Sequence, residues 1–443
     1  MPWKRRAFRG SNLARAMHIG DLREIARRKV PNFIFEYVEG GAEDEATLRH
    51  NRAALEALRF VPRTLVDTRT RHQRLELFGR ESASPLVIAP TGGNGLLYPL
   101  GDFALARAAA RYNIPFCLST VSTARLERVA EAVRVSSAPQ DTGAVSRPGA
   151  KAVDPRLWMQ LYVMENRKVA EDIVARAAAA GYEALVFTTD ANTFGSREWD
   201  RRNYRSPGKP TLLNLLDAAR HPRWLYEVLV RRGVPSFENF ASFLPPGAAT
   251  ALGGSTVIPK LFAPSICWDD LSWLRRLWPG KLLVKGILCV EDAERAADLG
   301  CDGIVLTNHG GRQLDYCVSP IEVLPPIAAA VGHRLAILID SGFRRGTDVI
   351  KALALGARAV MIGRATLYGL AAGGQRGVER ALEILTGEID RTLGHLGCRT
   401  VSELGPHLLH GQAHGQTHGY GVGGGALRQE SRVTTPGDLP HEA

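Results

Sequence analysis

The chain has few cysteines, and no two of them form a recognisable motif. Six cysteines are scattered over 443 residues without a CxxC pair. This spacing excludes a disulfide framework and a cysteine-based zinc site, and it fits a reducing compartment. The uncharged stretch 243–259 is interrupted by prolines and glycines, so we expect no membrane-spanning helix there. The basic N-terminus is not followed by an apolar segment, and we therefore expect no secretory signal.

Basic residues outnumber acidic ones. The 56 Lys and Arg against 45 Asp and Glu give a formal net charge of +11. Hydrophobic residues at 45% and charged residues at 23% are typical of a globular protein. An excess of positive charge favours an acidic partner such as nucleic acid or an anionic membrane surface. Because no nucleic-acid-binding signature accompanies the charge, we expect no nucleic-acid partner.

Eight short apolar runs recur along the chain. Buried parallel strands have such continuous apolar runs, whereas half-exposed strands alternate. Alanine-rich stretches with helical spacing lie between most of them, for example 102–111, 169–180, 290–299 and 346–355. Strand and helix alternating eight times predict an α/β fold, a (β/α)8 TIM barrel. The runs are 85–89, 115–120, 158–163, 184–190, 282–286, 303–308, 336–340 and 359–363.

Polar residues follow or end every one of these runs. The carboxyl ends of barrel strands form the active-site face, and a purely structural strand end would carry small or apolar residues instead. We therefore predict a large polar ligand on this face. The residues at the ends of the runs are Thr91, Ser119, Gln160 with Tyr162, Thr188 with Asp190, Lys285, Asn308 with His309, Asp340 with Ser341, and Gly363 with Arg364.

Several segments interrupt the alternation of strand and helix. Residues 1–20 read as a basic N-terminal arm and 21–410 as the barrel domain, with an N-terminal helical part. We predict a flexible loop insertion at 134–154, rich in Ser, Ala, Pro and Gly, and a long insertion after the fourth run, from 191 to 281. The tail 411–443 is rich in Gly and His and is expected to be disordered. Its histidines His410, His414 and His418 could bind a metal only if helical, and the surrounding glycines argue against a helix, so no metal is expected.

The sequence after the sixth run carries groups suited to catalysis. His309 at a strand end is a natural general base, and Arg312 three residues later can bind a carboxylate through its planar fork. The seventh and eighth runs lead into Gly342, Arg344 and Gly363, where barrels of this type commonly bind phosphate. No GxGxxG loop accompanies a strand near the start of the chain, so the expected phosphate belongs to flavin mononucleotide (FMN) rather than to a nicotinamide cofactor.

Several motifs in order carry a family resemblance. They are TNHGGRQLD at 307–315, IDSGFRRG at 339–346, LLVKGIL at 282–288, MQLYV at 159–163 and PTGGNG at 90–95. Over 21–409 the chain resembles the FMN-dependent 2-hydroxy acid dehydrogenase and oxidase family. Within it, EYVEGGAEDE at 36–45 and HPRW at 221–224 are most similar to the membrane-associated, mandelate-oxidising branch, although lactate-like substrates remain open.

The resemblance implies a role for each motif residue. His309 would be the catalytic base and Asp190 its partner, which fits the effect of a carboxylate on a neighbouring imidazole. Lys285 would stabilise the reduced flavin. The substrate would be bound by Tyr37, Tyr162, Arg197, His309 and Arg312. Cofactor contacts are implied for Thr91, Gly92, Ser119, Gln160, Thr188, Lys285, Thr307, Asp340, Gly342, Arg344, Gly363 and Arg364.

Structural alternatives stay open for some of these residues. Tyr37 could be a packed aromatic residue, Arg197 a solvated charge among other arginines, and Asp190 a helix cap. Lys285 is harder to explain, because an unpaired buried ammonium is costly. Thr307 stands where the family more often has serine. Gly92 and Gly93 predict extra room over the flavin for a larger or aromatic substrate.

A basic, leucine-rich segment favours a membrane surface. Residues 201–232 carry eight Lys or Arg against Asp217 and Glu227, and leucines and Trp224 are interleaved with them. This composition suits an interfacial anchor on anionic lipid, and we predict a membrane-binding segment within 201–260. The resemblance implies a homo-tetramer on the inner face of the cytoplasmic membrane that passes electrons to a quinone or another respiratory acceptor. A soluble oxidase that uses oxygen is the alternative.

Overall fold

The fold is a closed barrel of eight parallel strands, seen in a computed structural model that describes residues 8–137, 154–206, 209–244, 249–251 and 261–411. The order around the barrel is β10-β11-β12-β3-β4-β5-β6-β9. All eight strands fall within or overlap the eight predicted runs, so the predicted TIM barrel is confirmed. Their bounds are β3 Leu86–Ile88, β4 Phe116–Leu118, β5 Leu157–Leu161, β6 Ala184–Thr188, β9 Lys281–Ile287, β10 Gly303–Leu306, β11 Ala336–Ile339 and β12 Ala359–Ile362.

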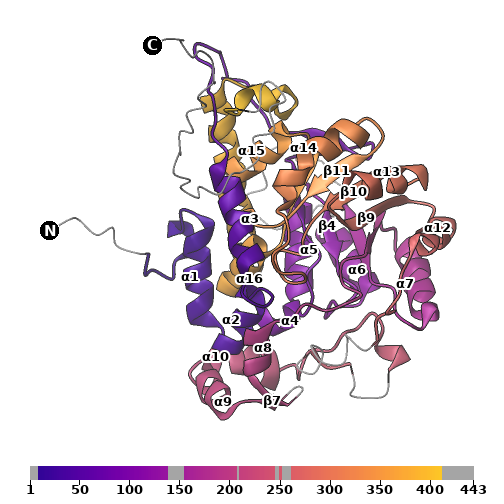
Figure 1. The fold of residues 1–443 in the computed structure, drawn as a ribbon. Helices are drawn as coiled ribbons and strands as arrows, with labels where there is room; N and C mark the ends of the chain where they lie inside the picture. Colours follow the sequence, from indigo (N-terminus) through magenta and orange to yellow (C-terminus); the bar gives the residue numbers. More distant parts are fainter. Residues whose placement is uncertain (1–7, 138–153, 207–208, 245–248, 252–260, 412–443) are drawn as a thin grey trace, which may run out of the picture.

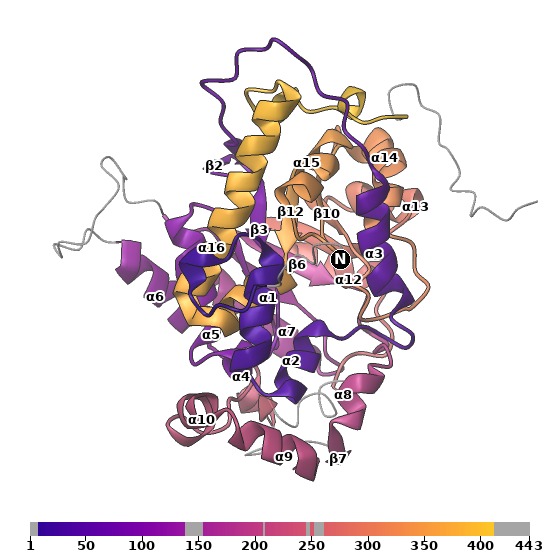
Figure 2. The same ribbon diagram turned by 90° about the vertical axis from the view of Figure 1, so that its left-hand side faces the viewer.

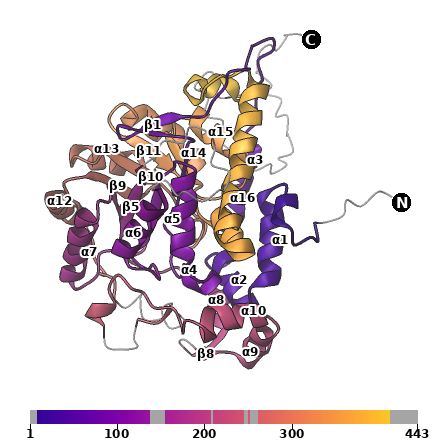
Figure 3. The same cartoon turned by 180° about the vertical axis from the view of Figure 1, so that it is seen from behind.

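Helices surround the barrel, as Figures 1 and 3 show. The last of them, α16, is interrupted at Gly373 and Gly374, which have non-helical backbone angles. Its first part begins directly at the end of β12, so its N-terminus lies at the barrel mouth. The surrounding helices are α5 Gly101–Arg111, α6 Leu126–Ser137, α7 Arg167–Ala179, α12 Trp268–Leu277, α13 Val290–Asp298, α14 Pro320–Val331, α15 Gly346–Ala354 and α16 Arg364–Leu396.

The predicted loop insertion begins later than expected. Helix α6 continues through residues 134–137, because Leu126, Val129 and Val133 are buried along one face and Arg134 donates a hydrogen bond to the Ala180 carbonyl at 2.6 Å. Serine and alanine content alone therefore placed the start of the loop too early. The rest of the insertion, 138–153, lies outside the described residues, as do 1–7 of the basic arm and 412–443 of the tail.

Three helices precede the barrel and cover one side of it (Figure 2). They are α1 Ile19–Lys29, α2 Asn32–Glu39 and α3 Ala46–Ala57. Helix α1 packs along α16, and Figure 3 shows the two side by side. Two further short strands, β1 Leu75–Leu77 and β2 Arg80–Ser82, form a hairpin. The hairpin places Leu77 and Phe78 against the apolar interior of the barrel.

The insertion after β6 forms a separate layer at the barrel mouth. Its described elements are α8 Glu198–Arg202, β7 Tyr204–Ser206, β8 Lys209–Pro210, α9 Leu212–Ala219, α10 Pro222–Trp224, η2 Leu225–Val230 and η3 Ala241–Phe243. Figures 1 and 2 show α8, α9 and α10 beside α2. The buried indole of Trp224 donates to the carbonyl of Leu96 in α4 (Asn94–Leu97) at 2.7 Å, which fastens this layer to the barrel. Within the described residues, no helix is long and apolar enough to cross a membrane.

Trp158 fills the barrel interior next to the β1–β2 hairpin, and its loss should destabilise the fold. Trp158 is fully buried there, packs against Phe78 with ring centroids 5.7 Å apart and donates to Glu183. We expect Trp158→Ala to lower the free energy of unfolding by about 3–5 kcal/mol, because the cavity cannot collapse between closed strands. Trp199→Ala is the control, since this side chain is 49% exposed and its loss should cost less than about 1 kcal/mol. Denaturant unfolding of both variants measures the difference, and equal losses would contradict this account.

Candidate active site

A cavity of about 220 Å³ opens over the carboxyl ends of the strands. Most of the residues singled out from the sequence line it. Gln160, Asp190 and Thr307 do not line it but contact residues that do. Thr188 does not line it either and accepts a hydrogen bond from Gln160. The predicted residues on its wall are Tyr37, Thr91, Gly92, Ser119, Tyr162, Arg197, Lys285, His309, Arg312, Asp340, Gly342, Arg344, Gly363 and Arg364.

His309 and Asp190 form a hydrogen-bonded pair. The Nδ1 atom of His309 lies 2.9 Å from Oδ1 of Asp190, so Asp190 orients the imidazole instead of capping a helix. A carboxylate in this position holds the proton on Nδ1 and leaves Nε2 able to accept one. Burial alone would raise the pKa of Asp190, but the charges of His309 and Lys285 outweigh burial and lower it.

The loop that carries His309 has an unusual backbone. His309, Gly310 and Gly311 all have positive φ angles, of 58°, 67° and 75°. The glycines adopt this region without a steric cost, whereas His309 does not. The loop is held by a reciprocal amide pair between Asn308 and the buried Asn51 of α3, with N···O distances of 2.9 and 2.7 Å. The strained turn and this pair together aim the imidazole into the cavity.

A row of side-chain hydrogen bonds joins three neighbouring strand ends. The Ser119 hydroxyl donates to Oε1 of Gln160 at 3.1 Å, and Nε2 of Gln160 donates to the Thr188 hydroxyl at 3.1 Å. All three residues are at most 3% exposed. Because the amide of Gln160 is held by both neighbours, the row is a fixed set of donors and acceptors under the cavity floor.

Lys285 continues this row on β9. Its Nζ atom lies 3.4 Å from Oδ2 of Asp340 and donates to the Thr307 hydroxyl at 3.2 Å. The Thr307 hydroxyl in turn donates to Asp340. Burial would lower the pKa of Lys285, but Asp340 and Asp190 outweigh it and raise the pKa. The buried ammonium is therefore kept protonated, and it faces the cavity, where an electron-rich ring could be stabilised.

The opposite end of the cavity suits a phosphate group. Gly342, Arg344 and Gly363 line it beside the N-terminus of α16, where free backbone N–H groups and the helix dipole favour an anion. The buried ammonium at one end and the phosphate site at the other fit the isoalloxazine and single phosphate of FMN.

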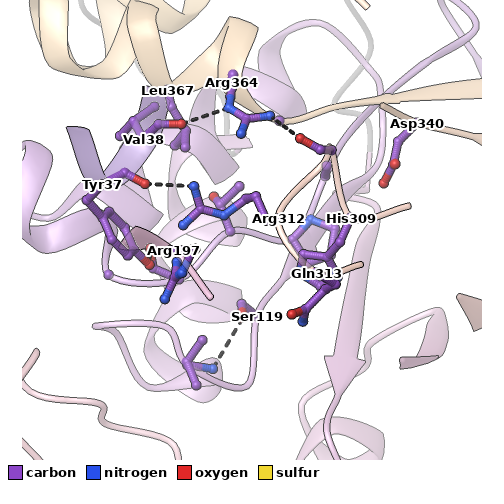
Figure 4. A pocket seen from close by; sticks show the side chains of 18 of the residues that line it. Tyr37, Val38, Ser119, Arg197, His309, Arg312, Gln313, Asp340, Arg364 and Leu367 are labelled. Carbon is purple, nitrogen blue, oxygen red and sulfur yellow. Dashed lines mark hydrogen bonds between the residues drawn. The ribbon is translucent and has the colours of Figure 1, made fainter. Parts of the chain in front are cut away.

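The Arg364 side chain, which was expected to contact the cofactor, mainly contacts the protein backbone. Its guanidinium donates to the backbone carbonyls of Val38, Gly310 and Gly40 at 2.8–2.9 Å (Figure 4). The side chain therefore ties the end of α2 to the His309 loop. A phosphate at the start of α16 would contact the backbone N–H of Arg364 and would be attracted by the positive charge of Arg364. Most N–H donors of the Arg364 guanidinium are already bonded to the three carbonyls.

Two arginines and a tyrosine line the same cavity as His309. The guanidinium groups of Arg197 and Arg312 lie 5.6 and 5.2 Å from the centroid of the Tyr37 ring, and Figure 4 shows the three side chains together. Arg312 also donates to the carbonyls of Tyr37 and Gly40. Burial and repulsion from Arg197 and Arg364 lower the pKa of Arg312 to about 9. Tyr37 and Arg197 thus belong to the cavity wall, not to packing or solvent.

An apolar part of the wall was missed by sequence reasoning. Its residues come from α2, α4 and the insertion, where no periodic signal marks them, and they are Ile34, Leu96, Phe194, Tyr204, Phe237 and Phe262. The hypothesis of extra room fits Gly93 better than Gly92. A Cβ atom on Gly93 would lie 3.5 Å from the Tyr37 hydroxyl, whereas one on Gly92 would collide with Val121 at 2.4 Å.

No candidate metal site accompanies the cavity. Within the described part of the chain, no group of three or more His, Cys, Asp or Glu side chains could hold a metal ion. His410 is exposed, and His414 and His418 lie outside the described residues.

Comparisons with known proteins agree with this geometry. The family described as FMN-dependent dehydrogenase matches residues 26–411. The chain is 43% identical to (S)-mandelate dehydrogenase of Pseudomonas putida over 89% of this chain and 94% of that protein. It is 40% identical to an L-lactate dehydrogenase of Caulobacter sp. (strain K31), over 88% and 97%. A crystal structure described as the monotopic membrane protein (S)-mandelate dehydrogenase superposes with a TM-score of 0.80 at 42% identity, over 89% and 99%.

These matches confirm the resemblance, the FMN cofactor and the enzyme class that were expected from the sequence. The chain belongs to the FMN-dependent dehydrogenase family and is a 2-hydroxy acid dehydrogenase of the mandelate and lactate dehydrogenase type.

Proposed function

We propose that this enzyme oxidises an (S)-2-hydroxy acid with an aromatic side chain, such as mandelate, to the 2-oxo acid. One observation carries the proposal: His309, which is paired with Asp190, lines the same cavity as Arg197 and Arg312, and part of the wall of that cavity is apolar and aromatic. A carboxylate fits the arginines, and an aryl group fits the wall formed by Phe194 and Phe262. Relatives named for mandelate and lactate support the same reaction.

Each polar residue then has a distinct part in the reaction. Arg197 and Arg312 bind the substrate carboxylate and fix the position of the α-carbon. The Nε2 atom of His309 accepts a proton from the substrate, and Asp190 stabilises the resulting imidazolium. The Tyr162 hydroxyl, 3.4 Å from that Nε2 atom, is placed to hydrogen-bond the substrate hydroxyl. FMN, when bound, would accept the two electrons and the second hydrogen that the substrate loses, and the Lys285 ammonium would supply positive charge at its site.

Replacing the base tests this assignment. We expect His309→Gln to lower kcat by about 10²–10⁴-fold while FMN remains bound, because the amide keeps polar contacts but cannot take a proton. Turnover of (S)-mandelate with a soluble dye, together with flavin content, measures both effects. His333→Gln serves as the control, since His333 is an exposed residue after α14. Near-normal turnover in His309→Gln would refute His309 as the base.

The lowered pKa of Arg312 predicts that KM for the substrate depends on pH in the alkaline range. Arg312 is a cation below its pKa of about 9 and loses its charge as the pH rises through that value. We therefore expect KM for the carboxylate substrate to be constant near neutral pH and to rise above pH 9, by about tenfold per pH unit at most. A profile of KM between pH 6 and pH 10.5 measures this. A KM that stays flat across the range would contradict a loss of charge on Arg312 near pH 9.

We also propose that the enzyme lies on an anionic membrane surface through α9 and η2. The buried face of α9 carries Asn214 and Ala218, whereas its four leucines point outward and are 53–77% exposed. This is the reverse of a normal surface helix, whose apolar face is buried. Tyr226 and Val230 on η2 are also exposed, and the arginines at 220, 223, 231 and 232 are exposed beside them. Leucines ringed by cations suit the headgroup region of a bilayer.

This placement supports a peripheral enzyme on the inner face of the cytoplasmic membrane with a quinone as electron acceptor. The insertion that carries α9 and η2 is joined to α4 by the hydrogen bond from Trp224, and Leu96 of α4 lines the cavity. A lipid-soluble acceptor would therefore need to travel only a short way from the bilayer. The relative described as a monotopic membrane protein is consistent with this assignment. The homo-tetramer expected from the resemblance stays a prediction.

Removing two leucines tests the membrane surface. Each leucine buried in lipid contributes about 1.5–3 kcal/mol, so Leu213→Ser with Leu216→Ser should weaken binding to anionic phospholipid vesicles about a hundredfold or more. The rate at which the double variant reduces a quinone embedded in the vesicles should fall as vesicle binding falls. The rate at which it reduces a soluble dye should not change.

Leu277→Ser, at a 40% exposed position on α12, is the matched control for the leucine variants. Unchanged vesicle binding by the double variant would refute the surface. Oxygen consumption in place of quinone reduction by the unmodified enzyme would favour a soluble oxidase.

A further inference from the structure

Asp200 is a buried carboxylate on the cavity wall that neither catalysis nor folding explains. It lies in α8, three residues after Arg197, and is 8% exposed. Neither of its side-chain oxygens receives a hydrogen bond from any residue that the structure describes. A buried carboxylate without donors costs free energy, and such groups are rare in folded proteins. A carboxylate kept in this position is expected to serve the site that it lines.

Charge, not hydrogen bonding, holds Asp200 in place. The Nε atom of Arg197 lies 3.3 Å from its Oδ2 atom, an ion pair without hydrogen-bond alignment. Arg312, on the loop after β10, is also attracted to Asp200. The other titratable groups that face it are Glu36 of α2 and Tyr204 of β7. Burial and the charge of Asp200 raise the pKa of Tyr204, and burial together with the charges of Glu39, Glu45 and Asp200 raises the pKa of Glu36.

The ion pair fixes one edge of the Arg197 guanidinium. Its Nε atom faces Asp200, and its flat face lies against the Tyr37 ring. Arg197 lines the cavity, and its two Nη atoms make no hydrogen bond to the described part of the chain. Arg197 occupies the N-cap position of α8 without a capping hydrogen bond, and the spacing of three residues places Asp200 beside it within the first turn of the helix.

We propose that Asp200 is a positioning residue, which holds Arg197 by its Nε edge so that the two Nη atoms face the substrate carboxylate. The inference rests on the proposed role of Arg197 in binding that carboxylate. Without Asp200 the guanidinium keeps its charge but loses its orientation, so the forked contact with a carboxylate is weakened.

The test compares Asp200→Ala, Asp200→Asn, Arg197→Met and the double variant Asp200→Ala with Arg197→Met. We expect Asp200→Ala to raise KM for (S)-mandelate about tenfold, with kcat within about twofold and FMN content unchanged. The double variant should be no worse than Arg197→Met alone, because Asp200 acts through Arg197. Asp200→Asn keeps an oxygen beside Nε without the charge, so its KM should fall between those of the unmodified enzyme and Asp200→Ala.

The control and the inhibitor measurements separate positioning from general damage. Glu198→Ala removes an exposed carboxylate from the same helix, one that pairs with Arg202, and KM should not change. Asp200→Ala should weaken binding of the non-reactive carboxylate benzoate about as much as it raises KM, and leave binding of neutral benzamide unchanged.

Additive effects on KM in the double variant would overturn the positioning role, and so would a loss of kcat or FMN at unchanged KM. If Asp200→Ala does not fold, the same test is made with Asp200→Asn: KM of the double variant Asp200→Asn with Arg197→Met is compared with KM of Arg197→Met alone. An unchanged KM in Arg197→Met would overturn the proposed carboxylate site itself and the positioning role with it.

Discussion

Closure of the parallel barrel is the constraint on which the rest of the structure depends. Because all eight strands run in one direction, their carboxyl ends meet at one rim, and the polar side chains that follow them are forced together away from bulk water. Polar groups crowded in this way must form hydrogen bonds either to one another or to a bound ligand. The Ser119–Gln160–Thr188 row and the contacts among Lys285, Thr307 and Asp340 are bonds of the first kind. The polar groups that line the cavity are available for a ligand.

The pairing of charges around this cavity indicates what it binds. Lys285 is paired with Asp340, His309 with Asp190, and Arg197 with Asp200. Arg312 and Arg364 donate only to backbone carbonyls and form no ion pair with a carboxylate in the described residues. Arg344, which also lines the cavity, donates from its side chain to the Phe343 carbonyl and likewise has no ion pair in the described residues. Three guanidiniums therefore remain without a carboxylate partner, Arg312 beside the proposed substrate and Arg344 and Arg364 at the proposed phosphate site. The proposed reaction brings two anions to the same places, the substrate carboxylate and the FMN phosphate.

The sequence predicted the barrel and most of the polar residues that line the cavity, for reasons that are local. Buried parallel strands are continuous apolar runs, and residues such as His309 and Lys285 follow them directly. What it could not predict depends on distant contacts. The extension of α6 rests on packing of Val133, and the engagement of Arg364 rests on carbonyls of α2 and the His309 loop. The aromatic wall comes from the insertion, whose path over the barrel mouth no periodicity encodes.

The central claim is that FMN, the His309–Asp190 pair and an aryl-accepting wall act on one substrate. An anaerobic titration of the purified enzyme, followed by its visible flavin absorbance, tests this most directly when (S)-mandelate, L-lactate and glycolate are added in turn. The account predicts that (S)-mandelate bleaches the flavin at lower concentration and faster than the two small acids. Bleaching by lactate or glycolate in preference to mandelate would contradict the aromatic specificity, and a protein that cannot take up FMN would contradict the site itself.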